Sequence, residues 1–290
     1  MRNILLLFQI FLFLSCREID VEKNKLRGDD YRLFQGTPVW QLAKAVQDSD
    51  VDRIKKLVTK EKLNIDFQES VYGKTLLMVA IANENYKSFK ALLEAGANPN
   101  IHDSYDGTSA IIMAADLEEP DNIKFLKLLL QYKADPNDIE TGERREGNTT
   151  RRTPLLNACS DVTAIADPII KVKLLVEAGA NINFRNEFGA SPLENASVFD
   201  HYDVVLYLLQ NGADYKSVLY TEEGKEYYLW DALRFDLYDL DSKEYEEKMK
   251  VVDFLKEKGI DYRNTKIPDY AINQAKKWYP ENWEEYLSKY

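Results

Sequence analysis

The sequence predicts an all-α fold, a solenoid of about six helix pairs closed by a C-terminal capping helix. The stretch from Thr75 to Asn100 carries two short apolar helix patterns and then ends in Gly-Ala-Asn-Pro-Asn. Four similar stretches follow it along the chain, and a weaker one precedes it. Self-similarity of this kind is typical of repeat arrays, in which each unit buries its apolar face against its neighbours. The repetition therefore predicts the architecture before any single residue does.

The N-terminal stretch is not expected to be part of the fold. Arg2 precedes an apolar run over residues 4–14. That run is shorter than the roughly 20 residues of a membrane-spanning helix and fits a cleaved signal peptide over residues 1–15. It ends in Leu-Ser-Cys, which resembles a bacterial lipobox although Phe13 stands where Leu is usual, and the resemblance implies lipidation of Cys16. The alternative is an ordinary secretory signal with an incidental Cys.

The next segment is expected to tether the protein to a membrane. Acyl chains on Cys16 would contribute about 0.8 kcal/mol per buried CH2 and anchor the protein in the bacterial envelope. Arg17 stands where an inner-membrane retention signal would place Asp, which favours the outer membrane. Residues 17–36 are charged and poor in apolar side chains. We expect residues 16–36 to be a lipidated Cys followed by a flexible tether that spans on the order of 25 Å.

The second helix of each unit carries two aligned apolar columns. Their members lie three residues apart, which places them on one helical face. The columns are Ile54, Phe89, Leu126, Val172, Val205 and Val252, and Leu57, Leu92, Leu129, Leu175, Leu208 and Leu255. The helices are expected to end at Gly96, Lys133, Gly179, Gly212 and Gly259. Four of these five residues are Gly, which suits a left-handed helix C-terminus.

The first helix of each unit opens with a hydroxyl residue, which can cap a helix, and Pro suits the first turn. The openings are Thr75-Leu76-Leu77, Thr108-Ser109-Ala110, Thr153-Pro154-Leu155 and Ser191-Pro192-Leu193. With the closing Gly-Ala-Asn-Pro-Asn pattern, they resemble the ankyrin repeat, whose signature joins Thr-Pro-Leu-His to Gly-Ala-Asp-x-Asn. The resemblance covers residues 37–264, although the signature His is absent, and implies a protein-binding scaffold. Residues 265–290 are expected to form C-terminal capping helices.

The composition argues against several classes of function. A formal net charge of −11 disfavours nucleic-acid binding, which needs clustered Lys and Arg. His102 and His201 fall in separate repeats, so no metal site is expected. Cys159 lies inside a helix pattern and is expected to be a buried core residue. Because no nucleophile elbow, P-loop or dinucleotide fingerprint occurs, we expect no enzyme, no catalytic residue and no cofactor.

One loop is longer than the others and is basic. Asn137 and Thr153 lie 16 residues apart where the regular distance is 8, so eight residues are inserted. The inserted region carries four arginines, Arg144, Arg145, Arg151 and Arg152. Arg binds carboxylates through two parallel hydrogen bonds, so this loop could dock on an acidic surface of a protein partner. The alternative is a mobile loop kept soluble by its charges.

Aromatic side chains indicate two further surfaces. Tyr72, Tyr105 and Phe188 occupy comparable positions in their loops and are candidates for the ordinary ankyrin binding surface. Residues 217–290 carry ten of the 18 Tyr and three of the four Trp, among them Trp278. These aromatics could be binding hot spots, but a terminal unit must also cover its own end. We favour the second interpretation.

The leading hypothesis is a protein-binding, lipid-anchored protein of the bacterial envelope. We expect it to be a monomer and to catalyse no reaction. A specific form of this hypothesis is an immunity-type inhibitor that neutralises a toxin delivered to the periplasm. The alternative is an envelope scaffold that organises several partners. An enzyme accessory, or an enzyme of unrecognised type, is the third class.

Overall fold

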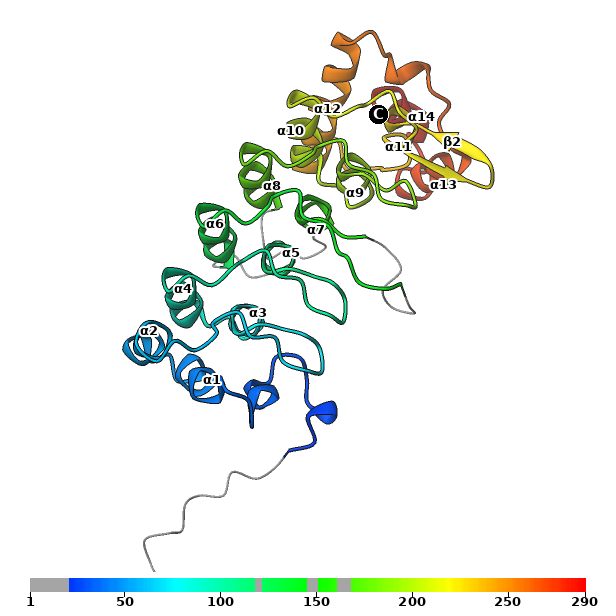
Figure 1. Ribbon diagram of the computed structural model, residues 1–290. Coiled ribbons are helices and arrows are strands. Elements are labelled where there is room, and N and C mark those ends of the chain that lie inside the picture. The colour runs from blue at the N-terminus through cyan, green and yellow to red at the C-terminus, as the bar shows by residue number, and fades with distance from the viewer. Residues whose placement is uncertain (1–20, 118–121, 145–150, 161–167) are drawn as a thin grey trace, which may run out of the picture.

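The computed structural model describes residues 21–117, 122–144, 151–160 and 168–290. Within these residues, six helix pairs follow one another, as the sequence predicts. They are α1 (Trp40–Gln47) with α2 (Val51–Thr59), α3 (Leu76–Ala82) with α4 (Tyr86–Glu94), α5 (Ala110–Ala115) with α6 (Ile123–Gln131), α7 (Pro154–Cys159) with α8 (Pro168–Glu177), α9 (Pro192–Val198) with α10 (Tyr202–Gln210), and α11 (Leu229–Ala232) with α12 (Lys243–Glu257). The first five pairs form two parallel rows, with the long loops on the side of the first helices (Figure 1). The predicted all-α solenoid is confirmed.

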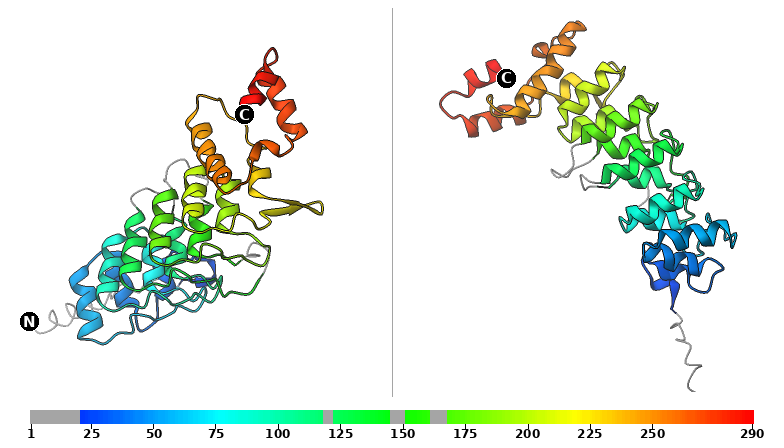
Figure 2. Two further views of the ribbon diagram at one scale, coloured as in Figure 1. Left: turned by 90° about the horizontal axis from the view of Figure 1, so that it is seen from above. Right: turned by 90° about the vertical axis from the view of Figure 1, so that its left-hand side faces the viewer.

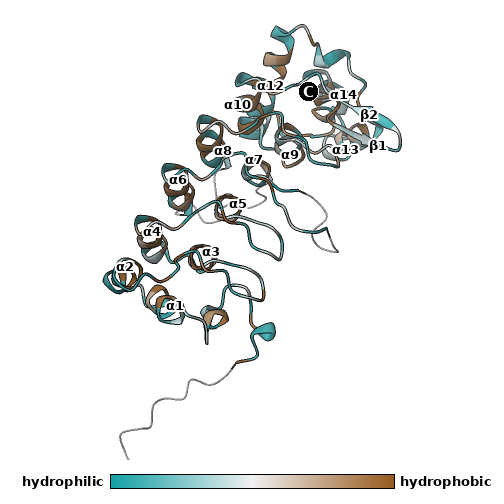
Figure 3. Cartoon of the chain, viewed as in Figure 1, coloured by the Kyte–Doolittle hydropathy of each residue, from teal (hydrophilic) through white to brown (hydrophobic). Residues whose placement is uncertain are grey.

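The predicted apolar columns of the second helices form the core. Every member of both columns is at most 6% exposed. The first helices contribute small residues such as Ala80 and Ala158, which are fully buried and let the two rows lie close together. Apolar surfaces of neighbouring helices therefore face one another along the array (Figure 3). Each fully buried aliphatic side chain contributes about 1.5–3 kcal/mol, so this core is the main source of stability.

A bridging asparagine joins each central unit to the next. Asn100 donates from Nδ2 to the main-chain oxygen of Lys133 at 3.2 Å and accepts from the main-chain N–H of Asp135 at 2.9 Å. Asn137 and Asn183 make the same pair of bonds to the following units. The bridged turn needs a left-handed residue, which is usually Gly, and Lys133 adopts it with a φ of 63°. These bonds fix the spacing between units.

Residues 21–36 differ from the expected tether. They contain two short 3-10 helices, η1 (Lys23–Lys25) and η2 (Tyr31–Phe34), and Leu33 and Phe34 are fully buried. The η2 segment packs against α1 and covers the face that a preceding unit would bury. The prediction of a flexible tether is therefore wrong for residues 21–36, because a few apolar side chains stand among many charged ones. Cys16 and residues 17–20 lie outside the described residues.

The C-terminal part adds elements that the repeat pattern does not contain. A two-stranded antiparallel sheet pairs β1 (Tyr220–Glu222) with β2 (Lys225–Tyr227). Its turn has positive φ at Glu223 and Gly224, which matches the twist of the two strands. Two capping helices, α13 (Asp269–Trp278) and α14 (Trp283–Lys289), then extend sideways from the end of the array (Figure 2). They enclose a second, small core built from Leu237, Ala271, Ala275, Tyr286 and Tyr290.

Candidate protein-binding surface

The loops that join one helix pair to the next project from one edge of the array (Figure 1). We call them fingers and number them in chain order: residues 66–75, 100–108, 137–153, 183–191 and 216–228. The third finger is described over 137–144 and 151–153 only. Together the fingers form a surface, the finger edge, that carries the six described members of the seven protein-binding candidates named from the sequence: Tyr72, Tyr105, Arg144, Arg151, Arg152 and Phe188.

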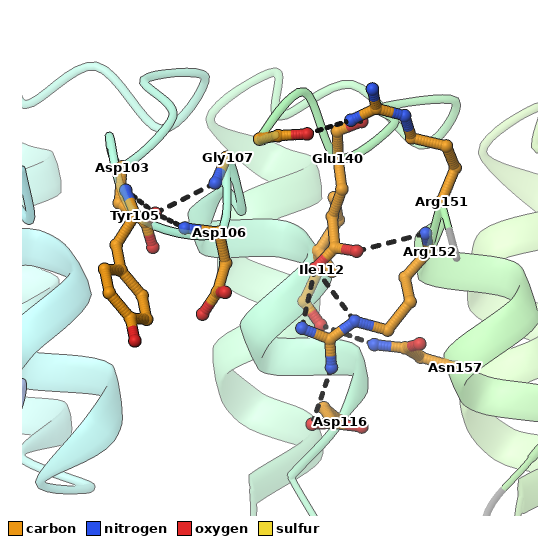
Figure 4. Close-up of polar contacts among 11 residues, drawn as sticks. Asp103, Tyr105, Asp106, Gly107, Ile112, Asp116, Glu140, Arg151, Arg152 and Asn157 are labelled. Carbon is orange, nitrogen blue, oxygen red and sulfur yellow. Dashed lines mark hydrogen bonds and ion pairs between the residues drawn. The ribbon is translucent and has the colours of Figure 1, made fainter. Parts of the chain in front are cut away.

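A polar side chain at the base of each of the first four fingers contacts that finger's own main chain. In the second finger, Oδ1 of Asp103 accepts hydrogen bonds from the N–H groups of residues 105–107 at 3.0, 2.7 and 3.0 Å (Figure 4). Glu69 accepts three such bonds in the first finger, and Asn186 accepts two in the fourth. Glu140 occupies this position in the third finger. Because these bonds fix the loop conformation, the tips are preorganised for binding.

Aromatic side chains lie at the tips of three fingers, as predicted, but they are not equivalent. Phe188 is 67% exposed and Tyr105 is 46% exposed. Tyr72 is half-buried, and its hydroxyl donates to the main-chain oxygen of Leu26 at 2.7 Å. The rings of Tyr72 and Tyr105 meet edge to face with centroids 5.3 Å apart. Tyr72 therefore packs against Tyr105 and helps to hold its ring in place, whereas the rings of Tyr105 and Phe188 are exposed and accessible to a partner.

The second and third fingers are bonded through their main chains. The N–H of Thr141 donates to the oxygen of Gly107 at 3.0 Å, and the N–H of Gly142 donates to the oxygen of Asp106 at 3.2 Å. A side chain at Gly107 would meet the nitrogen of Gly142 at 1.9 Å, so this approach requires glycine. His102 adds a contact between its Nε2 and Oδ1 of Asp138 at 2.8 Å. These contacts therefore fix the second and third fingers relative to each other.

Two of the predicted docking arginines instead close the base of the third finger. Oε1 of Glu140, which is 2% exposed, accepts from Nε and Nη2 of Arg152 at 2.8 and 2.6 Å. Arg151 donates from Nη1 to the main-chain oxygens of Glu140 and Gly142 at 2.8 and 2.7 Å. Figure 4 shows both arginines reaching toward Glu140 from the returning segment of the finger. Their side chains thus serve the fold, and the predicted role as docking groups is corrected in this respect.

The third of these arginines links two fingers. Arg144 forms an ion pair with Glu187, whose Oε2 also accepts from the main-chain N–H of Arg151 at 3.3 Å. This contact places the third finger beside exposed Phe188. Arg145 lies outside the described residues. The sequence did contain a clue to the clamp, since Glu140 follows its Asn by three residues, as Asp103 does.

A second exposed aromatic surface lies at the junction between the last repeats and α13, where the sequence favoured a covering role over a binding role. Tyr270 and Trp278 of α13 are 64% and 47% exposed, and Val198 and Phe199 at the end of α9 are 59% and 38% exposed. These side chains do not cover the end of the solenoid. The predicted covering role holds for other C-terminal aromatics, because Tyr262 is buried in the main core and Trp230 and Tyr238 pack against it.

The described residues offer little support for other kinds of site. Among them, no group of three or more His, Cys, Asp or Glu side chains could hold a metal ion. No helix in the described part of the chain has the length and apolar character to cross a membrane. Cys159 is fully buried, as predicted, and burial raises the pKa of its thiol. A buried thiol with a raised pKa is unreactive.

Comparison with curated proteins shows what the chain is similar to. Protein PhlB of Serratia liquefaciens is 30% identical over 175 residues, which are 60% of this chain and 69% of PhlB. Cyclin-dependent kinase inhibitor 2A of Monodelphis domestica is 29% identical over 141 residues, which are 49% of this chain and 72% of the inhibitor. The chain spans about a third or less of the length of three other curated relatives that it matches.

Solved structures and a family model agree on the fold. An ankyrin repeat domain from Acinetobacter baumannii aligns with a TM-score of 0.54 and 25% identity, covering 72% of this chain and 94% of that domain. The model of ankyrin repeats in three copies matches residues 42–140 and 127–218. Such repeats are typically non-enzymatic scaffolds for protein–protein interaction. The chain belongs to the ankyrin repeat family.

Proposed function

We propose that this chain is a non-enzymatic, protein-binding lipoprotein of the bacterial envelope that inhibits one cognate protein through its finger edge. The observation that carries the proposal is the rigid presentation of Tyr105 and Phe188. Both side chains are exposed, and both stand on fingers whose main chains are held by buried or half-buried polar groups. Ordered aromatic anchors are the usual hot spots of protein interfaces, because little entropy is lost when a partner binds them.

An inhibitory role is supported by two points. One similar protein is, by its name, an inhibitor of a cyclin-dependent kinase. The long third finger is anchored at its base and paired to the fourth finger, so it adds contact surface without loosening the edge. Inhibition needs only that the edge cover a functional surface of the partner. An immunity-type inhibitor is one protein of this kind.

The test is capture of a partner from envelope extract with the full chain, followed by a stoichiometry measurement. A double variant, Tyr105→Ser with Phe188→Ser, removes both exposed anchors, while Lys127→Ser on the opposite row is the control. We expect one partner in a one-to-one complex, lost in the double variant and retained in the control. Unchanged capture by the double variant would show that the finger edge is not the binding surface.

The second candidate function is an envelope scaffold, which the length of the edge favours, since five fingers offer room for more than one partner. Several partners that bind simultaneously, each lost in a different finger variant, would identify a scaffold. A single partner whose activity falls on binding would identify an inhibitor.

The anchor is a separate part of the proposal and has its own test. The Leu-Ser-Cys stretch ending at Cys16 supports lipidation, and the Arg that follows supports the outer membrane. Labelled palmitate should be incorporated into the wild-type chain and not into Cys16→Ser, which should also leave the detergent phase. Equal labelling of both chains would contradict the lipoprotein assignment.

A further inference from the structure

A groove lies at the junction where the end of α9 faces the start of the C-terminal cap. It consists of two adjoining cavities of about 240 and 190 Å³ that share Phe235 and Asp236 in their linings. Asp200, Tyr270 and Trp278 line the larger cavity, and the smaller one continues toward the β-hairpin. The groove therefore runs from α13 toward the β-hairpin.

The outer wall of the groove is an aromatic stripe on α13. Tyr270, Gln274 and Trp278 recur every four residues and share one helical face, and all three line the larger cavity. Ala271 and Ala275 are fully buried on the other face of α13. Packing of the small alanines against the C-terminal core leaves the large aromatic rings exposed. An exposed aromatic stripe beside a cavity is a surface that a partner can cover.

Two carboxylates lie in the groove. Oδ2 of Asp236 accepts a hydrogen bond from the hydroxyl of Tyr202 at 2.6 Å, and burial raises the pKa of Asp236 to about 6. Burial also raises the pKa of Asp200, against an opposing hydrogen bond from Tyr238. Within the described part of the chain, neither carboxylate makes an ion pair with a basic side chain. In the described residues, neither carboxylate is therefore neutralised by a directly paired cation.

Buried Lys248 attracts both carboxylates electrostatically but forms no ion pair with either of them in the described part of the chain. Lys248 is fully buried and donates from Nζ to the main-chain oxygen of Asp236 at 2.9 Å. Its Nζ lies 3.6 Å from the centre of the Tyr290 ring, on the side of the C-terminal core. Burial lowers the pKa of Lys248 to about 6, which weakens its attraction to the two carboxylates near neutral pH. A cation that entered the groove would find two carboxylates and aromatic faces together.

We propose that this groove binds a lysine or arginine side chain, flanked by apolar residues, on a basic segment of the partner protein. Aromatic faces attract a cation through their quadrupole, and carboxylates pair with it directly. The net charge of −11 also favours a basic partner. The inference rests on the proposed protein-binding function and adds the chemistry of the partner. Val198 and Phe199 provide the apolar contact for the flanking residues.

The test uses two labelled nine-residue peptides that differ only in a central Arg or Gln between leucines, titrated against the full chain by fluorescence anisotropy. We expect the Arg peptide to bind with a Kd of about 1 mM or tighter and the Gln peptide to bind about tenfold more weakly. Equal binding of the two peptides, or no binding of the Arg peptide at that concentration, would overturn the inference.

Variants locate the binding site. Trp278→Ala removes an exposed ring, and Asp200→Asn keeps a residue type that tolerates the φ of 58° at this position. Each should weaken binding of the Arg peptide at least fivefold, while Tyr132→Ala, which removes an exposed ring at the end of α6, should not. Unchanged affinity in both groove variants, with circular dichroism showing native folds, would also overturn the inference.

The outcomes for the groove and for the finger edge can be separated. Partner capture that depends on Phe188, together with absent peptide binding, would refute the groove alone. Peptide binding that depends on Trp278, together with capture that ignores Phe188, would refute the finger edge alone.

Discussion

The central repeats and the C-terminal unit are stabilised in different ways. Between residues 75 and 216, the same interaction recurs at the same place in each unit, and a bridging Asn bonds each turn to the next. The series ends at Lys216, which stands where the next bridging Asn would be. Beyond it, buried Arg234 and Lys248 contact main-chain oxygens and tyrosine rings of the cap. Repeated contacts therefore stabilise the central array, whereas polar contacts that occur only once attach the C-terminal unit.

The largest expected effect is the loss of a column residue in the centre. Leu129 is fully buried between units, so Leu129→Ala should lower the free energy of unfolding by about 2–5 kcal/mol. Because coupling in arrays is mainly to neighbouring units, hydrogen exchange should accelerate in α4 and α8 as well as in α6. Urea denaturation provides the measurement, with exposed Lys127→Ala as the control. A loss below about 0.5 kcal/mol would contradict the assigned core.

The next effect has the opposite sign and lies in the C-terminal unit. Lys248→Met replaces a buried amine, whose pKa is lowered by burial, with an apolar side chain of similar length. Because folding then no longer disfavours a protonated amine, the change should stabilise this unit by about 1–4 kcal/mol at pH 7. Tryptophan fluorescence can follow it, since three of the four Trp lie there. Lys250→Met on the exposed face of α12 is the matched control. Destabilisation of the Lys248→Met chain would show that the buried amine is required.

The same lysine predicts a pH dependence. Its pKa is lowered from 10.5 to about 6 in the folded chain, so the unfolded chain binds one more proton between these values. Stability from this group is therefore lost as pH falls and gained as pH rises through the window. The wild-type C-terminal unit should be more stable at pH 9 than at pH 7. The Lys248→Met chain should lack this gain, and an equal gain in both chains would assign it to another group.

A smaller effect tests the bridging asparagines directly. Asn137→Ala removes two hydrogen bonds at an exposed position and should cost about 0.5–1.5 kcal/mol. Lys216→Ala, at the equivalent position before the C-terminal unit, should change the free energy of unfolding by less than about 0.5 kcal/mol. Thermal denaturation of both variants gives the comparison. Equal losses in the free energy of unfolding would mean that the two hydrogen bonds of Asn137 make no measurable contribution.

The smallest effect concerns the ion pair between fingers. Arg144 is nearly half exposed, so Arg144→Ser should change stability by less than about 0.5 kcal/mol. It should instead slow association with the captured partner, because the third finger loses one of its two contacts with Glu187 of the fourth. Stopped-flow measurements of the association rate at two salt concentrations would show this. An unchanged rate would mean that Arg144 has no role in partner binding.

How far the sequence predicts the structure follows from the same comparison. Repeated features were predictable, because each pattern occurs several times and its copies can be aligned within the sequence. They include the apolar columns through Leu129, the turn at Lys133 and the helix pairs. The packing of Leu33 and Phe34 occurs once. Because these residues stand in a charged segment, the composition of that segment indicated a tether and not a packed structure. The hairpin around Gly224 also occurs once.

The candidate surface was predictable in position but not in detail. Tyr105 and Phe188 could be named, because their fingers align with one another. The pairing of Arg152 with Glu140 could not, since it depends on how the two ends of an inserted loop meet. The groove at Trp278 depends on which face of α13 packs inward, and no repeated unit provides a template for that choice.

Photo-crosslinking tests the central claim, that the partner binds at the finger edge, most directly. A photoreactive phenylalanine analogue would replace Phe188, which is 67% exposed on the fourth finger, or Lys127 on α6 as the control. Both chains would be irradiated in envelope extract. We predict one crosslinked partner from position 188 and none from position 127. Crosslinking from position 127 alone, or equally from both positions, would contradict the finger edge as the binding surface.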